Sequence, residues 1–65
     1  MSFMDYINRL RLSYSRELIV NLSEKLTIES IAIKAGFNSR TTFYRLFLEK
    51  YGLTPEEFKK MARKA

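Results

Sequence analysis

The amino-acid sequence predicts a small all-α domain of about four helices. Apolar residues recur every three or four positions, and no segment shows the strict two-residue alternation of a strand. Both glycines and the single proline fall where a helix is expected to end or begin. A chain of 65 residues, 46% of them hydrophobic, has room for one core only, so every helix must help to bury it.

The first predicted helix begins after Ser2, which is a suitable N-cap residue, and runs for about five turns to near Asn21. Apolar side chains recur along it at helical spacing: Phe3, Ile7, Leu10, Tyr14 and Leu18. Residues 22–26 form a short connection to the next helix.

The second predicted helix has Thr27 as its N-cap residue. Leu26, just before the cap, and Ile31, in the first turns, are spaced to form a hydrophobic staple. Gly36 is expected to end the helix, because glycine adopts the positive φ of a helix C-terminus without strain.

The third predicted helix runs from Asn38 or Ser39 to about Tyr51 and is ended by Gly52. The fourth has Thr54 as N-cap and Pro55 in its first position. Glu57 then completes a capping box. Leu53 and Phe58 are spaced to form a second hydrophobic staple, at the start of this helix.

Composition excludes several kinds of site. The chain has no cysteine and no histidine, so it has no disulfide, zinc finger, thiol nucleophile or imidazole base. We therefore expect neither an enzyme nor a protein with a metal or cofactor. The net charge of +5 lies mostly in residues 27–65, which hold eight Lys or Arg against four acids. This imbalance favours a polyanionic partner.

The junction of the second and third helices has the composition of a tight corner. In the segment Ile31-Ala32-x-x-x-Gly36-Phe37, the alanine permits close helix approach and the glycine makes the turn. In the third helix, Phe43, Leu46 and Phe47 form one apolar stripe. The four phenylalanines of this region are interpreted as core residues and not as base-stacking platforms: Phe37, Phe43, Phe47 and Phe58.

The face of the third helix opposite this stripe carries Thr41, Tyr44, Arg45 and Leu48, and Arg40 lies to one side of it in the first turn. Apart from Leu48, these are hydrogen-bonding side chains and long cations. Such side chains suit the reading of base edges in the major groove. Residues 27–51 are therefore interpreted as a helix-turn-helix, within a homeodomain-like bundle. The main alternative is a helical protein–protein interaction or assembly module that does not bind DNA.

Four segments, in this order and spacing, carry a family resemblance over nearly the whole chain: Tyr6-Ile7-Asn8-Arg9-Leu10-Arg11-Leu12, Leu26-Thr27-Ile28-x-x-Ile31-Ala32-x-x-x-Gly36-Phe37, Phe43-x-Arg45-x-Phe47 and Tyr51-Gly52-Leu53-Thr54-Pro55-x-x-Phe58. The chain resembles the C-terminal part of the DNA-binding domain of AraC/XylS-type bacterial transcription regulators. In that family, two helix-turn-helix subdomains are joined by a long linker helix. The resemblance implies sequence-specific DNA binding in transcription regulation.

The resemblance also implies which residues contact DNA. The expected base contacts come from the third helix: Arg40, Thr41, Tyr44 and Arg45. Arginine can donate two hydrogen bonds to guanine, and a threonine methyl can meet a thymine methyl. Arg45 could equally hold a phosphate. The expected DNA-backbone contacts are Thr27, Ile28, Lys34, Ser39, Lys59 and Lys60. The alternative role of Lys59, Lys60, Arg63 and Lys64 is to complement the dipole of the last helix.

Residues 1–65 are expected to form a single domain: a linker-type helix in 1–22, the helix-turn-helix in 27–51 and a C-terminal helix in 54–64. The resemblance implies a fragment of a larger regulator, without its first subdomain and sensor region. Packing needs only Leu12, Ser15, Leu18 and Ile19, so we expect an exposed apolar patch of Phe3, Met4, Ile7 and Leu10.

Two features of the third helix depart from the family pattern. Leu48 and Glu49 stand where basic residues are common, which predicts a lower affinity for the DNA backbone. Lys50 falls near the core side of the helix, so its stem must extend outward to reach water. The chain has no apolar run of membrane-spanning length and no secretory signal, so we expect a cytoplasmic, nucleoid-associated protein.

Overall fold

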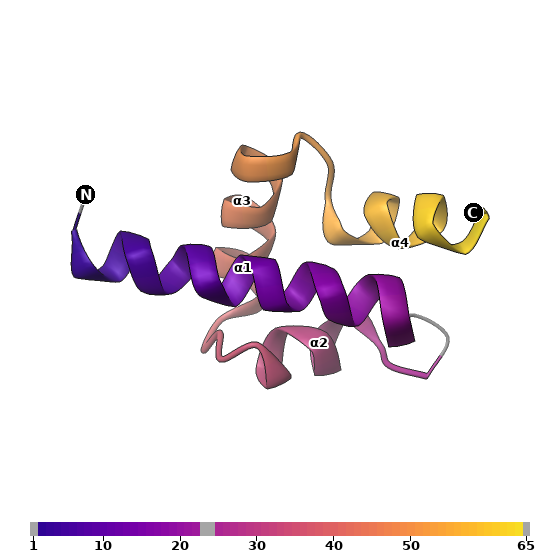
Figure 1. Cartoon of the computed structure of the whole chain (residues 1–65), viewed down its shortest axis with the longest axis horizontal. Helices are drawn as coiled ribbons and strands as arrows, with labels where there is room; N and C mark the ends of the chain where they lie inside the picture. The colour runs from indigo at the N-terminus through magenta and orange to yellow at the C-terminus, as the bar shows by residue number, and fades with distance from the viewer. Residues whose placement is uncertain (1, 23–24, 65) are drawn as a thin grey trace.

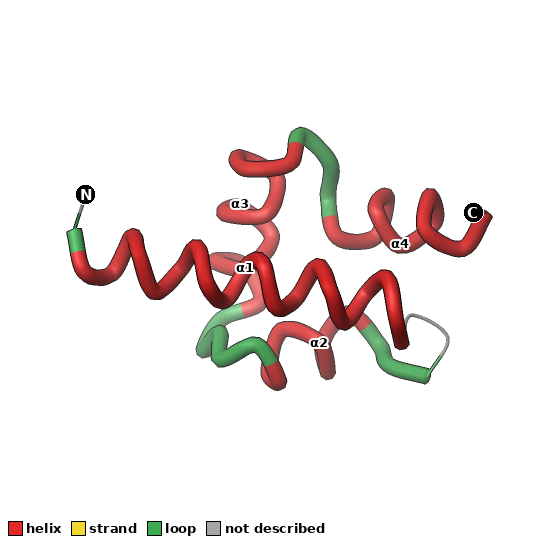
Figure 2. Tube along the Cα trace, in the orientation of Figure 1, coloured by secondary structure: helices red, strands yellow, loops and turns green. Residues whose placement is uncertain are grey.

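The computed structural model describes residues 2–22 and 25–64, with the side chains of 63 and 64 left out. The described residues form four helices and no strand: α1 (Phe3–Leu22), α2 (Ile28–Lys34), α3 (Arg40–Tyr51) and α4 (Pro55–Lys64). The predicted all-α class and its four helices are confirmed (Figure 2). Part of the predicted connection, residues 23 and 24, lies outside the described residues.

Helix α1 is the support on which the other three helices pack. Its 20 residues extend about 30 Å at 1.5 Å per residue, which accounts for most of the 35 Å long axis of the molecule. Helices α2, α3 and α4 all contact α1, and α3 also contacts α2 and α4. The first turns of α1 extend beyond the other helices (Figure 1).

Each helix begins with a hydrogen-bonded N-cap, and the sequence predicts those at Ser2, Thr27 and Thr54. The Thr27 hydroxyl accepts from the Ser30 N–H at 3.0 Å, and the Ser39 hydroxyl accepts from the Thr42 N–H at 3.3 Å. The Ser2 hydroxyl accepts from the Asp5 N–H at 3.1 Å, and the Asp5 carboxylate accepts from the Ser2 N–H at 3.3 Å. This reciprocal pair at the start of α1 was not predicted.

The predicted capping box of α4 is present. The Thr54 hydroxyl accepts from the Glu57 N–H at 3.1 Å, and the Glu57 carboxylate accepts from the Thr54 N–H at 2.9 Å. Pro55 occupies the first helical position with its side chain fully buried. The start of α4 is therefore fixed both by hydrogen bonds and by packing.

Both glycines have the positive φ expected of them, +97° at Gly36 and +76° at Gly52. At the end of α2, the Phe37 N–H donates to the Ala32 carbonyl and the Gly36 N–H to the Ile33 carbonyl, each at 3.0 Å. These two bonds form a Schellman motif, which turns the chain directly toward α3.

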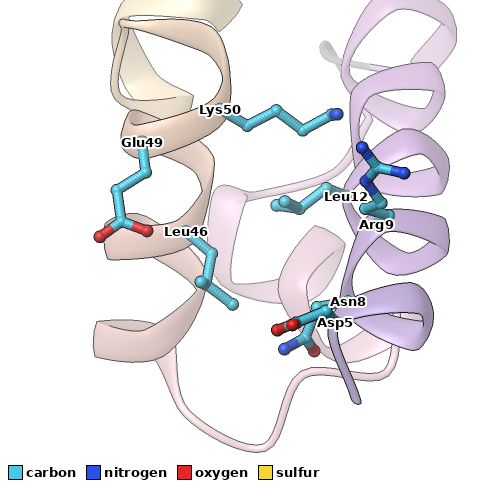
Figure 3. A pocket seen from close by; sticks show the side chains of 7 residues that line it. All are labelled: Asp5, Asn8, Arg9, Leu12, Leu46, Glu49 and Lys50. Carbon is cyan, nitrogen blue, oxygen red and sulfur yellow. The ribbon is translucent and has the colours of Figure 1, made fainter. Parts of the chain in front are cut away.

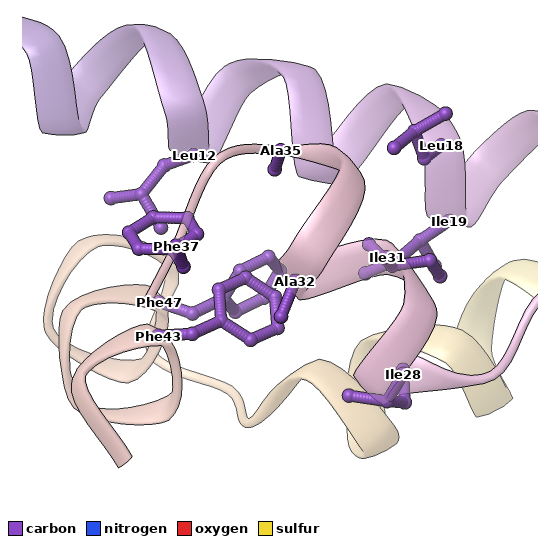
Figure 4. Packing of buried hydrophobic residues seen from close by; sticks show 10 residues of the cluster. All are labelled: Leu12, Leu18, Ile19, Ile28, Ile31, Ala32, Ala35, Phe37, Phe43 and Phe47. Carbon is purple, nitrogen blue, oxygen red and sulfur yellow. The ribbon is translucent and has the colours of Figure 1, made fainter. Parts of the chain in front are cut away.

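The core lies between α1 and the helix-turn-helix (Figure 4). It comprises ten apolar residues: Leu12, Leu18, Ile19, Ile28, Ile31, Ala32, Ala35, Phe37, Phe43 and Phe47. Ser15 is also fully buried, and its hydroxyl donates to the Leu12 carbonyl at 2.7 Å. The four α1 residues predicted to pack inward are all buried.

Aromatic rings connect α3 to its neighbours inside this core. The Phe43 ring centroid lies 5.0 Å from that of Phe37 and 5.6 Å from that of Phe47. The Phe47 centroid in turn lies 5.7 Å from that of Phe58 on α4. Phe37, Phe43 and Phe47 are buried, and Phe58 is half-buried against them, which confirms their interpretation as core residues.

We expect Gly36→Ala and Gly52→Ala to lower the free energy of unfolding by different amounts. Positive φ costs an alanine ~1–2 kcal/mol at either position. At Gly36, an added Cβ would also lie 3.2 Å from the Arg11 Nε, so that side chain must move, whereas nothing lies within 4 Å at Gly52. Urea unfolding should show Gly36→Ala as the more destabilised variant. Equal midpoints would show that the Arg11 contact is of no consequence in solution.

The capping box predicts a pH dependence for α4. The hydrogen bond from the Thr54 N–H lowers the pKa of Glu57 below its ordinary value. A lowered pKa in the folded state adds stability at higher pH, and this stability is lost as the pH falls through the folded-state pKa. Carboxyl NMR should detect the lowered value, and Thr54→Ala, which removes the hydroxyl of the box, should raise it. An ordinary pKa for Glu57 in the unmodified chain would contradict the capping box.

Candidate nucleic-acid interface

The outer face of α3 carries the residues predicted to contact bases. Arg40, Thr41 and Arg45 are exposed, and Leu48 keeps 46% of its surface accessible. Tyr44 is half-buried and packs against the core cluster. The structure therefore brings the four predicted base-contact residues to one helix, but it holds Tyr44 closer to the protein than the other three.

Arg40, Tyr44 and Glu56 form a hydrogen-bonded chain across the surface. The Arg40 Nη2 donates to the Tyr44 hydroxyl at 3.2 Å, and this hydroxyl donates to the Glu56 Oε1 at 2.7 Å. The Arg40 Cζ lies 5.1 Å from the Tyr44 ring centroid, within cation–π distance. The first turn of α3 is thus connected to the first turn of α4.

The pKa values of Tyr44 and Arg40 are both raised above their ordinary values. Burial raises the pKa of Tyr44, and the hydrogen bond to Glu56 adds to this, although Arg40 acts in the opposite direction. The hydrogen bond to Tyr44 is the largest cause of the raised pKa of Arg40. At neutral pH, the tyrosine is therefore a neutral phenol between a guanidinium and a carboxylate.

Sequence reasoning missed the contact between Glu56 and Tyr44. Arg40 and Tyr44 are four residues apart on one helix, a spacing that predicts contact. Glu56 lies 12 residues after Tyr44 on another helix, so helical periodicity carries no signal for this pair.

Arg45 lies beside Glu49, with 3.6 Å between Nη1 and Oε1. Both side chains are more than 60% exposed, and such pairs contribute only ~0–1 kcal/mol. The Arg45 guanidinium is consequently free to leave Glu49 when a stronger anionic partner is present.

The predicted DNA-backbone residues lie in α2 and α4 and at the N-caps of α2 and α3. Thr27 and Ser39 are exposed, and their hydroxyls serve as N-caps. The Ile28 side chain is buried in the core, so only its backbone could meet a phosphate. Lys34 is exposed in the last turn of α2, and Lys60 is exposed on α4.

Lys59 has a structural contact that the sequence did not reveal. Its ammonium donates to the Leu26 carbonyl at 3.2 Å in a half-buried setting. The two residues are 33 positions apart, so this bond ties the middle of α4 to the segment that leads into α2.

The N-terminal half of α1 leaves apolar side chains uncovered, as predicted. Phe3 is 74% exposed, and Met4 and Leu10 are more than half exposed, whereas Ile7 is half-buried. Three of the four patch residues are therefore open to solvent.

A groove of about 260 Å³ lies between this half of α1 and the later turns of α3 (Figure 3). Its lining is of mixed charge: Asp5, Asn8, Arg9, Leu12, Leu46, Glu49 and Lys50. The Lys50 side chain extends toward α1 (Figure 3). Lys50 is exposed, as its predicted contact with water requires.

Within residues 2–22 and 25–64, no group of three His, Cys, Asp or Glu side chains is arranged to hold a metal ion. Among the described helices, none is long and apolar enough to cross a membrane.

Comparison with known proteins places these features in a family. The family model described as a helix-turn-helix domain matches residues 1–61. The chain is 34% identical to the transcriptional activator RhrA of Rhizobium meliloti (strain 1021) over 64 residues, which are 98% of this chain and 20% of that protein. It is 29% identical to the melibiose operon regulatory protein of Escherichia coli (strain K12) over 63 residues, 97% of this chain and 20% of that protein.

The chain thus spans about a fifth of the length of the curated relatives it matches. No solved structure gives a significant match to it. The matched family consists of transcription regulators and not of enzymes. The match over 61 residues, together with these relatives, shows that the chain belongs to the AraC-type helix-turn-helix family of bacterial DNA-binding transcription regulators.

Proposed function

We propose that the chain recognises a DNA sequence by laying its third helix, Ser39 to Tyr51, in the major groove, with Arg40, Thr41 and Arg45 toward the bases. The observation that carries this proposal is the exposed face of α3, where two arginines and a threonine project away from a core that fixes the rest of the helix. Major-groove reading by the second helix of a helix-turn-helix is the common docking geometry of this motif.

Arg40, Thr41 and Arg45 are the proposed base contacts. Both arginines are long enough to donate to the O6 and N7 of guanine, and the Thr41 methyl suits a thymine methyl. Arg45 is the residue whose role is most open to a phosphate contact, because its exposed pairing with Glu49 leaves it able to turn in either direction. Tyr44 is not among them, because its hydroxyl is bound to Glu56.

Phosphate contacts are proposed for exposed groups around α3: the Lys34, Ser39 and Lys60 side chains and the backbone of Thr27 and Ile28. Lys59 is proposed to support the interface indirectly, since its ammonium is held by the Leu26 carbonyl. These contacts would give affinity without sequence information.

We further propose that residues 1–65 work as one domain within a larger regulator. In this arrangement α1 is the linker helix, and its uncovered apolar half packs on a first helix-turn-helix subdomain, with a sensor region beyond. The exposed Phe3, Met4 and Leu10 support this proposal, as does the fivefold greater length of the relatives. A regulator of this kind acts at the bacterial nucleoid, in the cytoplasm.

A salt titration tests DNA binding directly. With about four phosphates engaged, log K for duplex DNA should fall with log salt at a slope of about −3.6. Affinity should be weak, because one reading helix offers a small interface. The measurement is fluorescence anisotropy of a labelled duplex at two or more salt concentrations. An assembly module would show no binding even at ~50 mM salt, and that result would refute the proposal.

Substitution of the two arginines separates base reading from phosphate binding. Arg40→Ala and Arg45→Ala should each cost ~1–3 kcal/mol on duplexes selected from a random pool and relax the preference at one base pair. Arg16→Ala on α1 is the control for loss of one positive charge. If Arg45→Ala weakens all duplexes alike and reduces the salt slope by about 1, Arg45 binds phosphate instead.

A further inference from the structure

We infer that Glu56, acting through the Tyr44 hydroxyl, positions the Arg40 guanidinium for base reading, and that Tyr44 is a positioning residue and not a base reader. This inference rests on the proposed function and assigns a role in specificity to a residue of α4. It follows from the hydrogen-bonded chain that joins the two helices.

The hydrogen-bond chemistry permits one direction only. A guanidinium can only donate and a carboxylate can only accept, so the single hydroxyl proton of Tyr44 must go to Glu56. The hydroxyl oxygen then accepts from Arg40, at 3.2 Å. The 2.7 Å bond to Glu56 therefore uses the only donor that Tyr44 could have offered to a base.

The Tyr44 ring is itself held in place by the core. It is half-buried, and it meets the Phe43 ring edge-on with 6.0 Å between the centroids. Because Phe43 is fully buried, the tyrosine ring has little freedom to turn toward solvent. The hydroxyl is thus presented at a fixed point on the surface.

The backbone of Glu56 is held in place by the first turn of α4. Pro55 before it is fully buried, and Glu57 after it is bound to the Thr54 N–H in the capping box. Glu57 is therefore engaged elsewhere, which leaves Glu56 as the carboxylate that meets Tyr44.

Two contacts then restrain Arg40, which would otherwise be a mobile surface side chain. Its Nη2 is bound to the hydroxyl and its Cζ lies 5.1 Å from the ring centroid. A restrained guanidinium offers its remaining N–H groups in a defined direction, as bidentate recognition of guanine requires. Loss of the restraint should relax the base preference of Arg40.

The Glu56 charge has an opposite effect on affinity. A carboxylate beside a DNA-binding face repels phosphates, so its removal should strengthen binding to all duplexes. Removal of the positioning contact should weaken discrimination at one base pair. In Glu56→Ala, the discrimination at this base pair should therefore fall while the overall affinity for DNA rises. A loss of folding stability would lower both.

The test compares Glu56→Ala, Glu56→Gln and Tyr44→Phe in the whole chain, with Glu17→Gln on α1 as the charge control. Random duplexes are selected at low salt, and discrimination is measured at the base pair where Arg40→Ala abolishes it. A bidentate contact gives roughly 5- to 150-fold discrimination, and Glu56→Ala and Tyr44→Phe should each reduce it by about fivefold. Glu56→Gln, which still accepts from the hydroxyl, should retain it.

A second readout does not involve DNA. NMR order parameters of the Arg40 Nε–H should fall in Glu56→Ala and Tyr44→Phe and stay high in Glu56→Gln and Glu17→Gln. If Glu56→Ala and Tyr44→Phe keep the base-pair discrimination and the Arg40 order parameters of the parent chain, the inference is overturned and the proposed function stays intact. Failure of the parent chain to bind duplex DNA at any salt would instead refute the proposed function, and with it the role in specificity.

Discussion

Burial of Phe43 and Phe47 is the constraint on which the rest of the structure depends. Both side chains are completely inaccessible to solvent, and both come from α3. They lie on one face of the helix, so their burial sets its rotation about its own axis. The opposite face, which holds Thr41 and Arg45, is consequently turned to solvent. The same packing that stabilises this small domain also determines which residues it can present to DNA.

The core does not by itself define the geometry of the interface, because side chains on an exposed face are mobile. Helix α4 supplies the missing restraint at one point. Its Phe58 packs against Phe47, and its Glu56 reaches the hydroxyl of Tyr44. An apolar contact and a polar contact therefore connect the same two helices. Through them, a helix that follows the helix-turn-helix contacts the proposed reading face.

Helix α1 has two different halves. Its C-terminal half buries Leu18 and Ile19 in the core, and the Arg16 guanidinium lies 5.9 Å from the Tyr51 ring centroid at the end of α3. Its N-terminal half keeps Phe3 and Met4 exposed beside a groove of mixed charge. The core thus uses α1 only from Leu12 onward. The turns before Leu12 present the kind of surface expected where a further subdomain packs.

The helix limits and the core could be predicted from the sequence because they depend on short-range physics. An N-cap bond joins residues three apart, as at Ser39 and Thr42, and a glycine such as Gly36 relieves backbone strain where it stands. Helical periodicity likewise separates Phe43 from Thr41. Such signals lie within one or two turns of the chain, so no knowledge of the packing is needed to detect them.

Only the tertiary structure decided the partners of Tyr44 and Lys59. Glu56 and the Leu26 carbonyl lie 12 and 33 residues away from them, on segments whose approach depends on how α4 packs. The sequence alone placed Tyr44 on the reading face and Lys59 among the candidates for a phosphate. No local pattern could show that each of these polar groups has a protein partner, because such pairings arise only after the helices have been brought together by the core.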